Sequence, residues 1–194
     1  MILVVDNYDS FTYNLVQLIE TLGATTEVVK SDAEPAEALV AREPAAVVLS
    51  PGPGSPSDFD VSGTLAALRA RGIPVFGVCL GLQGMVEHFG AELGVLDYPV
   101  HGKPSWIEVR GGALFEGLPK RFRAGRYHSL YALRETLPAE LCVTAETEDG
   151  VVMAIEHARE ALAAVQFHPE SILTPGELGL RLIANAVASL CRSV

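Results

Sequence analysis

The sequence contains few cysteines, few positive charges and no long apolar run. Only three of its 194 residues are cysteine, at positions 79, 142 and 191, and no two of them form a CxxC pair. This scarcity argues against a disulfide framework and against a thiolate metal site. Cys142, in a strand-like run, and Cys191, on the apolar stripe of a helix, are expected to be buried and inert. Only Cys79 has unusual neighbours.

Positive charge is also scarce, which limits the classes of partner. The chain carries 24 acidic against 14 basic residues, a formal net charge of -10. Such a field repels phosphate backbones and anionic lipid surfaces, so neither a nucleic acid nor a membrane is expected as a partner. No apolar run reaches the ~18 residues of a membrane span, and the start, MILVVDNYDS, has no basic segment of a signal peptide. These features predict a cytoplasmic protein.

Length and composition predict one globular domain spanning residues 1–194. Apolar residues make up 49% of the chain and charged residues 20%, a mixture that can bury enough surface to offset the entropy of ordering. The sequence shows no internal repeat, low-complexity tract or linker that would divide it. A chain of this length is ordinary for a single core.

Alternating strand and helix patterns predict an α/β fold. In the first half, β-rich runs at 2–5, 25–30, 45–50 and 73–78 alternate with helical patterns, of which the clearest are 11–22, 61–71 and 80–89. This alternation is typical of a parallel sheet. Ser10 or Asp9 is the expected N-cap of the first helix, and Gly23 its end.

The second half is predicted to add antiparallel or mixed strands and a closing helix. Turn signals such as RGG and EDG separate strand-like runs at 105–110, 122–127, 141–147, 150–156 and 161–166. An apolar stripe from about 177 to 191 predicts the last helix. The expected architecture is therefore an open, mixed but largely parallel central sheet flanked by helices.

Cys79 lies where a predicted strand ends and a helix begins, inside the pattern GVCLG at residues 77–81. A nucleophile elbow has this form: the turn strains the backbone of the nucleophile, and glycine is needed two residues to either side. Cys79 would stand exposed on its tip, where the helix N-terminus favours thiolate, and the amide of Leu80 would face a developing oxyanion. The same stretch also fits a buried cysteine in a tight turn, with glycines present only for packing.

A histidine and a glutamate follow another predicted strand, in the stretch QFHPES at residues 166–171. Pro169 pushes His168 out of the helical region, so residues 168–170 must be extended or turned. In extended chain, residues i and i+2 face the same side, which makes His168 and Glu170 neighbours. The carboxylate could then orient and stabilise the imidazole as the third member of a triad does. The alternative is a polar loop.

The stretch SPGPG, residues 50–54, follows a third strand and predicts a rigid, irregular loop. The backbone amides near Gly52 and Gly54 could approach a substrate closely and act as donors beside that of Leu80. A mere connection would not need two prolines and two glycines in four residues. All three segments follow strands of one sheet, and ligands of open α/β sheets bind at the carboxyl ends of the strands.

Together these segments resemble the class I glutamine amidotransferases. GVCLGLQ is similar to the nucleophile signature of that family, QFHPES to its histidine and glutamate signature, and SPGPG to its oxyanion loop, in the family's order along the chain. The resemblance implies that Cys79 is the nucleophile, His168 the acid and base, and Glu170 its orienting partner. It also implies glutamine and oxyanion contacts from residues Gly52, Pro53, Gly54, Leu80, Gln83, Ser129 and Leu130.

Three further segments resemble particular members of this family. DNYDSFTYNL at 6–15, HGK at 101–103 and RYHSL at 126–130 look like the glutaminase subunit of anthranilate synthase, or its relative in aminodeoxychorismate synthase. The first two would help to dock or signal to a synthase subunit, and His128 would be structural or at the rim of the site. Without the resemblance, Ser129 would be assigned to a turn and Gln83 to a solvated helix surface.

The resemblance implies an L-glutamine hydrolase that supplies ammonia to a chorismate-binding synthase subunit, anthranilate synthase component I, in a hetero-oligomer. No metal and no organic cofactor would be needed in this chain, while Mg²⁺ is expected in the partner subunit. The alternatives are a glutaminase subunit for aminodeoxychorismate synthase, one subunit shared by both enzymes, and a non-catalytic regulatory module of the same fold. A cysteine peptidase or DJ-1-like enzyme with a similar elbow would lack the HPE and PGPG stretches.

Overall fold

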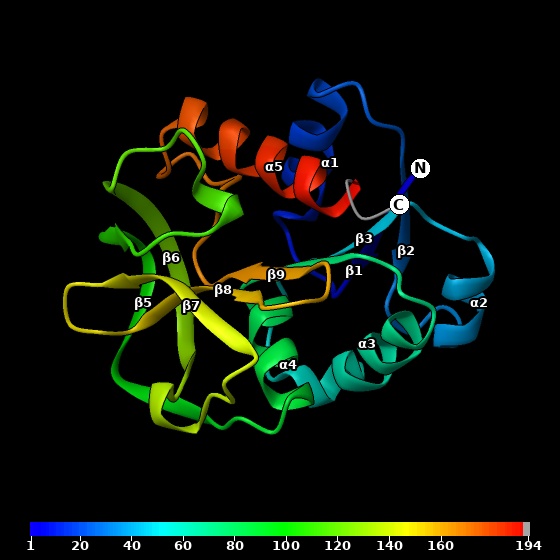
Figure 1. Cartoon of the computed structure of the whole chain (residues 1–194), viewed down its shortest axis with the longest axis horizontal. Coiled ribbons are helices and arrows are strands. Elements are labelled where there is room, and N and C mark those ends of the chain that lie inside the picture. Colours follow the sequence, from blue (N-terminus) through cyan, green and yellow to red (C-terminus); the bar gives the residue numbers. More distant parts are fainter. Residues whose placement is uncertain (192–194) are drawn as a thin grey trace.

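The computed structural model describes the backbone of residues 1–191 and the side chains of residues 1–189. Nine strands form one sheet in the order β2-β1-β3-β4-β9-β8-β7-β5-β6, with helices on both faces (Figure 1). The predicted α/β architecture with a mixed sheet and flanking helices is confirmed. The assignment of the whole chain to one domain stays a prediction.

Five strands form the parallel half of the sheet: β1 (Ile2–Asp6), β2 (Thr26–Lys30), β3 (Ala46–Leu49), β4 (Val75–Val78) and β9 (Leu162–Val165). All but β2, which lies at the edge, are buried at every position. Such continuous apolar runs are typical of strands that are covered on both faces. The β-rich runs of the sequence form strands here because their side chains are buried on both faces of the sheet.

Helices cover both faces of this half. The helices α1 (Thr12–Thr21) and α5 (Gly176–Cys191) pack together on one face, and α2 (Ala36–Ala41), α3 (Val61–Ala70) and α4 (Leu80–His88) cover the other (Figure 1). Gly23 ends α1 as predicted, at a φ of 83°. The predicted N-cap is wrong, because the first helical residue follows Phe11 and no side chain caps it. Asp9 instead accepts a hydrogen bond from the backbone amide of Phe11, at 2.7 Å.

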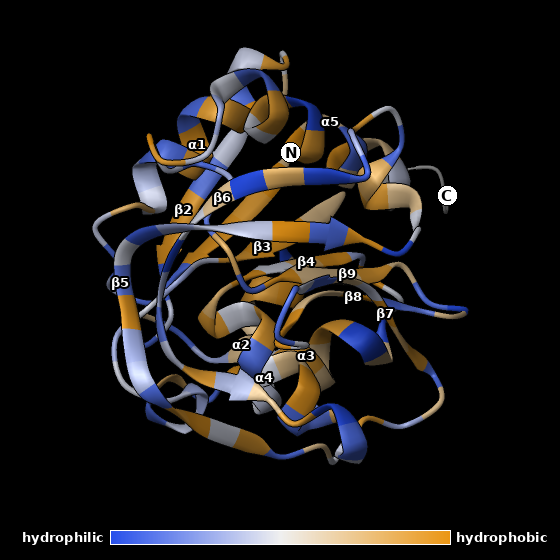
Figure 2. Ribbon diagram, turned by 90° about the vertical axis from the view of Figure 1, so that its left-hand side faces the viewer, coloured by the Kyte–Doolittle hydropathy of each residue, from blue (hydrophilic) through white to orange (hydrophobic). Residues whose placement is uncertain are grey.

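The antiparallel half consists of β5 (Leu93–Val109), β6 (Arg121–Ala132), β7 (Leu141–Thr147) and β8 (Val152–His157), with short 3-10 helices at Pro56–Phe59, Ala113–Phe115 and Arg134–Thr136. The strands β5 and β6 curl away from the parallel strands along one side of the molecule (Figure 2). β5 begins twelve residues before the predicted strand at 105. Its register shifts between 95 and 103, so the strand is irregular where Pro99 and Gly102 interrupt the strand pattern of the sequence.

The two cysteines outside the elbow were expected to be buried. Cys142 is exposed, so that prediction is wrong: it follows the buried Leu141 on β7, and alternation along the strand turns it outward. The side chain of Cys191 lies outside the described residues. Within residues 1–191, no helix is long and apolar enough to cross a membrane.

The arrangement brings three loops to one edge of the sheet. The strands β3, β4 and β9 are neighbours and run in parallel, so their carboxyl ends lie side by side. These ends lead into the loop at 50–54, into Cys79, and into the stretch at 166–171 respectively. The three segments that the sequence singled out therefore meet in space.

Candidate active site

Cys79 occupies a strained turn between β4 and α4. Its backbone has a φ of 53° and a ψ of -98°, a conformation that residues with a side chain rarely adopt. A Cβ at Gly77 would lie 2.6 Å from the backbone carbon of Gly81, and one at Gly81 would lie 2.7 Å from the carbonyl oxygen of Leu49. Both distances are far below van der Waals contact. The two glycines are therefore needed for the chain to turn here.

The thiol of Cys79 is not exposed, contrary to the sequence-based expectation. The residue is 5% exposed, because β6 and the loop at 50–54 close over the elbow. The sulfur accepts a hydrogen bond from Nε2 of Gln166, at 3.4 Å. Cys79 nevertheless lines a cavity of about 120 Å³, so a small substrate that enters it meets the thiol.

His168 and Glu170 form a buried pair directly after β9. Nδ1 of His168 lies 2.6 Å from Oε1 of Glu170, and the two side chains are 2% and 0% exposed. The chain turns here instead of continuing extended, since the amide of Ser171 donates to the carbonyl of His168 at 3.2 Å. The expected contact is present, but a turn makes it. The hydroxyl of Thr174 also donates to that carbonyl, at 2.7 Å, and fixes the histidine backbone.

The charges around His168 favour its protonated form. Burial alone lowers the pKa of His168, but the carboxylate of Glu170 and the side chain of Cys79 outweigh it, and the pKa lies well above the ordinary value. Nε2 of His168 has no hydrogen-bond partner within the described residues. Glu170 thus holds one ring nitrogen and leaves the other to exchange a proton with the thiol or with a substrate.

The cavity beside Cys79 collects the residues expected to contact a substrate. Its lining comprises Gly52, Pro53, Gly54, Cys79, Gln83, His101, Tyr127, His128, Ser129 and Leu130. Leu80 is predicted to act through its backbone amide, and its side chain is fully buried. Gln83 is not solvated but buried, and its Nε2 donates to the carbonyl of Leu130 at 3.2 Å. The structure therefore brings all the predicted residues together around one elbow.

The loop at 50–54 is held in place by the segment that follows β1. The side-chain amide of Asn7 donates to the carbonyl of Ser50 at 2.9 Å, and its backbone amide donates to the Ser50 hydroxyl at 2.8 Å. A Cβ at Gly52 would lie 2.8 Å from the carbonyl oxygen of Asn7, so only glycine fits. Part of the segment that was expected to dock a partner is thus a structural support of the loop.

Sequence reasoning missed several residues of this site. Gln166 donates to Cys79 and accepts from Nε2 of Gln83 at 3.3 Å, so it links the thiol to the substrate wall. Its position two residues before His168, at the end of a strand, was the available signal. His101 and Tyr127 line the cavity without any comparable signal.

His128 was expected to be structural or at the rim, and it lines the cavity as a neutral ring. Its Nε2 accepts from Nε of Arg126 at 3.0 Å, so the ring proton lies on Nδ1 and is donated to the carbonyl of Leu130 at 2.8 Å. Burial and the neighbouring guanidinium lower the pKa of His128 to about 3. A histidine with this pKa does not act as a base at neutral pH.

The arrangement suits nucleophilic attack on a carbonyl carbon. It offers a cysteine at a helix N-terminus, a histidine paired with a carboxylate, and a glycine-rich loop with backbone donors beside them. Among the described residues, no group of three or more His, Cys, Asp and Glu side chains is placed to hold a metal ion.

Comparisons with known proteins agree with this geometry. The family described as "Glutamine amidotransferase class-I" matches residues 3–188. The chain is 57% identical to "Anthranilate synthase" of Azospirillum brasilense over 97% of its own length, but it spans only 26% of that protein. It is 42% identical to "Aminodeoxychorismate/anthranilate synthase component 2" of Bacillus subtilis, over 100% of this chain and 99% of that one.

A solved structure shares the fold. It is that of a Thermoplasma acidophilum protein described as "a putative gmp synthase subunit a protein", which superposes with a TM-score of 0.86 at 26% identity. The match covers 99% of this chain and 94% of the other. The likeness therefore extends over the whole sheet and its flanking helices, including the three loops.

Proposed function

This chain belongs to the class I glutamine amidotransferase family, and from that premise we propose that it is the glutaminase subunit of an anthranilate synthase. It hydrolyses L-glutamine to L-glutamate and ammonia, and the ammonia passes to a chorismate-binding partner subunit. The observation that carries the proposal is the position of Cys79, on a strained elbow in a cavity lined by the loop at 50–54, with the side chain of His168 close enough to interact with the thiol.

The first half of the reaction forms a thioester. The Cys79 sulfur attacks the side-chain amide carbon of glutamine, while backbone amides of Leu80 and the loop at 50–54 stabilise the oxyanion. His168 then gives its Nε2 proton to the amide nitrogen, the C–N bond breaks, and ammonia leaves. The raised pKa of His168 supports this role, since the ring carries the proton that the leaving group requires.

The second half regenerates the thiol. Neutral His168 removes a proton from water, the hydroxide attacks the thioester, and the C–S bond breaks to give glutamate and the free thiol. Glu170 keeps the ring oriented through both steps. Gln83, Ser129 and Leu130 would hold the charged head of the glutamine with neutral donors and acceptors.

The partner must supply the remaining chemistry. The relatives include a longer protein named "Anthranilate synthase", of which this chain matches 26%, and a synthase part in the remainder would be the counterpart of this chain. Chorismate and the Mg²⁺ that it requires would be bound there, not in this chain. The exposed Tyr8 and Tyr13 of the segment at 6–15 support the view that this segment docks the partner.

A second candidate has a specific observation in its favour. The relative from Bacillus subtilis carries both names, aminodeoxychorismate and anthranilate synthase component 2, and it matches the chain over its full length. The glutaminase step is the same in both enzymes. One subunit could therefore serve two synthases, or aminodeoxychorismate synthase alone.

Reconstitution with the large subunit of anthranilate synthase from the same organism tests the proposal. Anthranilate is measured by its fluorescence, from chorismate with either glutamine or ammonium as nitrogen source. The Cys79→Ala variant should abolish glutamine-dependent synthesis and leave ammonium-dependent synthesis intact, while Cys142→Ala should change neither.

Two results would contradict the proposal. Persistence of glutamine-dependent synthesis in Cys79→Ala would remove this cysteine from the reaction. If the wild-type chain does not support glutamine-dependent anthranilate synthesis, it is either a non-catalytic module or the second candidate. Glutamine-dependent synthesis of aminodeoxychorismate with the large subunit of that enzyme would favour the second candidate.

A further inference from the structure

Arg126 is a buried cation without a carboxylate partner. It lies inside β6 and is 5% exposed. Its guanidinium donates from Nε to His128 at 3.0 Å and from Nη1 to the hydroxyl of Ser105 at 3.2 Å, and both acceptors are neutral. No ion pair within residues 1–189 includes Arg126. Buried charges in proteins are normally paired, so this one requires an explanation.

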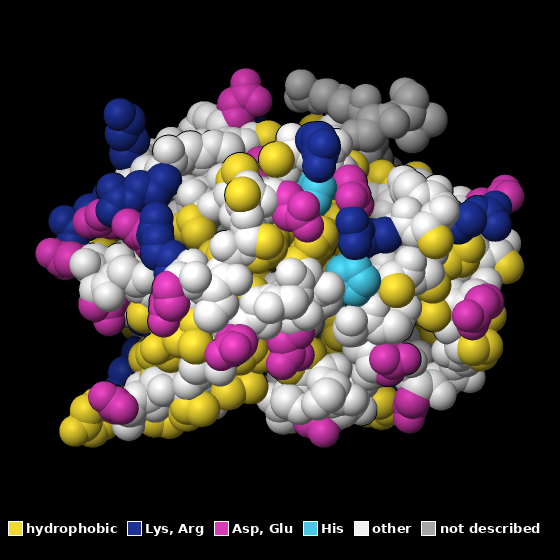
Figure 3. All heavy atoms as spheres, turned by 60° about the horizontal axis from the view of Figure 1, so that its bottom comes forward, with side chains coloured by type: hydrophobic (Ala, Val, Ile, Leu, Met, Phe, Trp, Pro, Cys, Tyr) yellow, Lys and Arg dark blue, Asp and Glu magenta, His cyan; other side chains and the backbone are white. Residues whose placement is uncertain are grey.

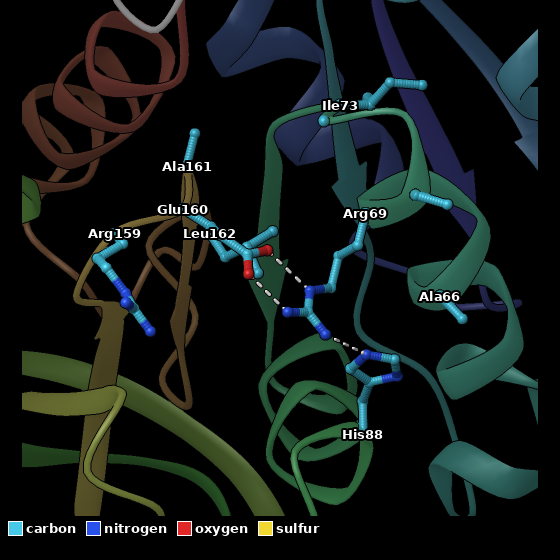
Figure 4. A pocket seen from close by; sticks show the side chains of 10 residues that line it. Ala66, Arg69, Ile73, His88, Arg159, Glu160, Ala161 and Leu162 are labelled. Atoms are coloured by element: carbon cyan, nitrogen blue, oxygen red, sulfur yellow. Dashed lines mark hydrogen bonds and ion pairs between the residues drawn. The ribbon is translucent and has the colours of Figure 1, made fainter.

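Another arginine of the chain shows the ordinary solution. Arg69 lines a larger cavity of about 520 Å³ at the ends of α3 and α4. Its guanidinium donates to both oxygens of Glu160, at 2.8 and 2.6 Å, and to Nε2 of His88 at 2.9 Å (Figure 4). All three guanidinium nitrogens are engaged. The charge of Arg69 is therefore satisfied within the chain, whereas that of Arg126 is not.

Arg126 lines a third cavity, between β5, β6 and the turn that joins β7 to β8. The volume is about 390 Å³, and the lining residues are Ser105, Trp106, Arg126, Thr147, Glu148 and Asp149. A small-molecule site of this kind typically has a volume of ~300–1,000 Å³. The cavity thus combines a cation at its buried wall, two carboxylates on an exposed turn, and one indole ring.

The surrounding ribbon is positive although the protein as a whole is acidic. Residues 103–134 contain seven of the 14 Lys and Arg side chains but only two of the 24 Asp and Glu. Lys and Arg side chains gather at the left of the molecule in Figure 3, the side on which Figure 1 draws β5, β6 and β7. Arg121 also stacks over the Trp106 ring, 4.8 Å from its centroid. Arg110, Arg121 and Arg134 pair with Glu146 and Glu148, so the positive charge that attracts a carboxylate comes from the other four cations of this stretch.

We propose that this cavity binds a free α-amino acid as a zwitterion. The carboxylate pairs with the guanidinium of Arg126, and the side chain packs on Trp106. The ammonium lies against Asp149 and Oε1 of Glu148, whose other oxygen is 3.4 Å from Nη2 of Arg121. A planar guanidinium binds a carboxylate through two parallel hydrogen bonds. In Arg126 these would come from Nη1 and Nη2, because Nε already donates to His128. The acidic pair explains why a simple anion is a poorer fit, since only a ligand that also carries a positive charge satisfies both ends.

The proposed site is connected to the cavity beside Cys79 by consecutive hydrogen bonds. Arg126 donates to His128, His128 donates to the carbonyl of Leu130, and Gln83 donates to the same carbonyl. A carboxylate bound to Arg126 would therefore be linked, through this series of hydrogen bonds, to the wall of the cavity beside Cys79. The connection gives the amino acid a route by which to influence glutamine binding.

The fluorescence of Trp106 offers a direct binding assay, because it is the only tryptophan of the chain. The probes are L-phenylalanine, N-acetyl-L-phenylalanine, which lacks the ammonium, and L-phenylalaninamide, which lacks the carboxylate. Saturable quenching or enhancement by L-phenylalanine is expected. Each modified probe should bind about tenfold more weakly or worse, the loss expected for one charge-assisted contact.

Variants separate the two ends of the site. The double change Glu148→Gln and Asp149→Asn, on an exposed turn, should weaken binding of L-phenylalanine about tenfold. It should not weaken binding of the N-acetyl derivative, an anion that the two carboxylates repel. Arg126→Lys, checked for folding by circular dichroism, should weaken both. Arg159→Gln is the matched control, since this exposed arginine lines the other cavity.

Three outcomes would overturn the inference. Absence of saturable binding by L-phenylalanine would exclude the site. Equal affinity of the folded double variant for the zwitterion would remove the acidic pair from it, and weakening by Arg159→Gln would place the ligand in the cavity of Arg69. None of these results bears on whether Cys79 hydrolyses glutamine.

Discussion

The strain at the elbow can be measured by replacing the nucleophile with glycine and with alanine. Cys79 has a φ of 53° and a ψ of -98°. Holding a residue with a Cβ in so sparsely populated a region costs about 1–3 kcal/mol. Glycine has no Cβ and tolerates positive φ, so Cys79→Gly should release this strain, whereas Cys79→Ala should retain it.

Glycine also has costs that must be separated from the strain. It loses more backbone entropy on folding than alanine does, by about 0.5–1 kcal/mol, and removing a buried methyl group costs about 0.8 kcal/mol. The exposed Cys142 on β7 provides the control, because its φ is not positive. The free energies of unfolding of Cys142→Gly and Cys142→Ala should therefore differ only by the backbone entropy cost of glycine. Subtracting the glycine-minus-alanine difference at 142 from that at 79 should leave about 1 kcal/mol in favour of glycine at 79.

Urea unfolding of the four variants gives this double difference. With a slope of about 1–3 kcal/mol per molar urea, 1 kcal/mol shifts the midpoint by about 0.3–1 M. A double difference of zero, or one that favours alanine at 79, would show that the elbow is not strained. Gly77 and Gly81 would then not serve a strained nucleophile either.

Three further predictions concern the same site. Gln166→Leu removes a hydrogen-bond donor from the sulfur, so alkylation of Cys79 by iodoacetamide should slow about tenfold while the exposed cysteine of β7 reacts as before; equal rates at Cys79 would contradict this. In Glu170→Gln, burial is no longer opposed by a carboxylate, so the pKa of His168, followed by NMR, should fall. The raised pKa of His168 contributes stability that is complete below about 6.5 and lost as the pH rises through the folded value. That loss should be smaller in Glu170→Gln, where only Cys79 still opposes the effect of burial. Gly81→Ala places a methyl group against a backbone carbonyl and should destabilise by about 1–3 kcal/mol or more in urea; an unchanged midpoint would refute the packing argument.

The sequence carried enough information to predict the sheet and its main site. Short apolar runs separated by amphipathic patterns have few ways to bury both faces, and this constraint gave the parallel strands and the meeting of three loops at their carboxyl ends. Cys79, His168 and Glu170 could be selected because glycine spacing and proline restrict the local backbone. These are local signals, which a sequence shows directly.

Features that depend on distant segments could not be predicted. The burial of Cys79 depends on β6 and the loop at 50–54, which cover it from other parts of the chain. The outward orientation of the Cys142 side chain depends on which face of β7 is buried, and an apolar run in the sequence does not show which face that is. The unpaired Arg126 could not be found either, since the absence of a partner is a property of the folded surroundings and not of neighbouring residues.

The central claim is that Cys79 hydrolyses glutamine, and the rate of glutamate release from L-glutamine by the reconstituted complex tests it most directly. Wild type, Cys79→Ala and Cys142→Ala are compared at saturating chorismate. Cys79→Ala should lower this rate about a thousandfold or more, as expected on removal of a nucleophile, and Cys142→Ala should leave it unchanged. Glutamate release by Cys79→Ala within about tenfold of wild type, in a complex that still uses ammonium, would contradict this claim.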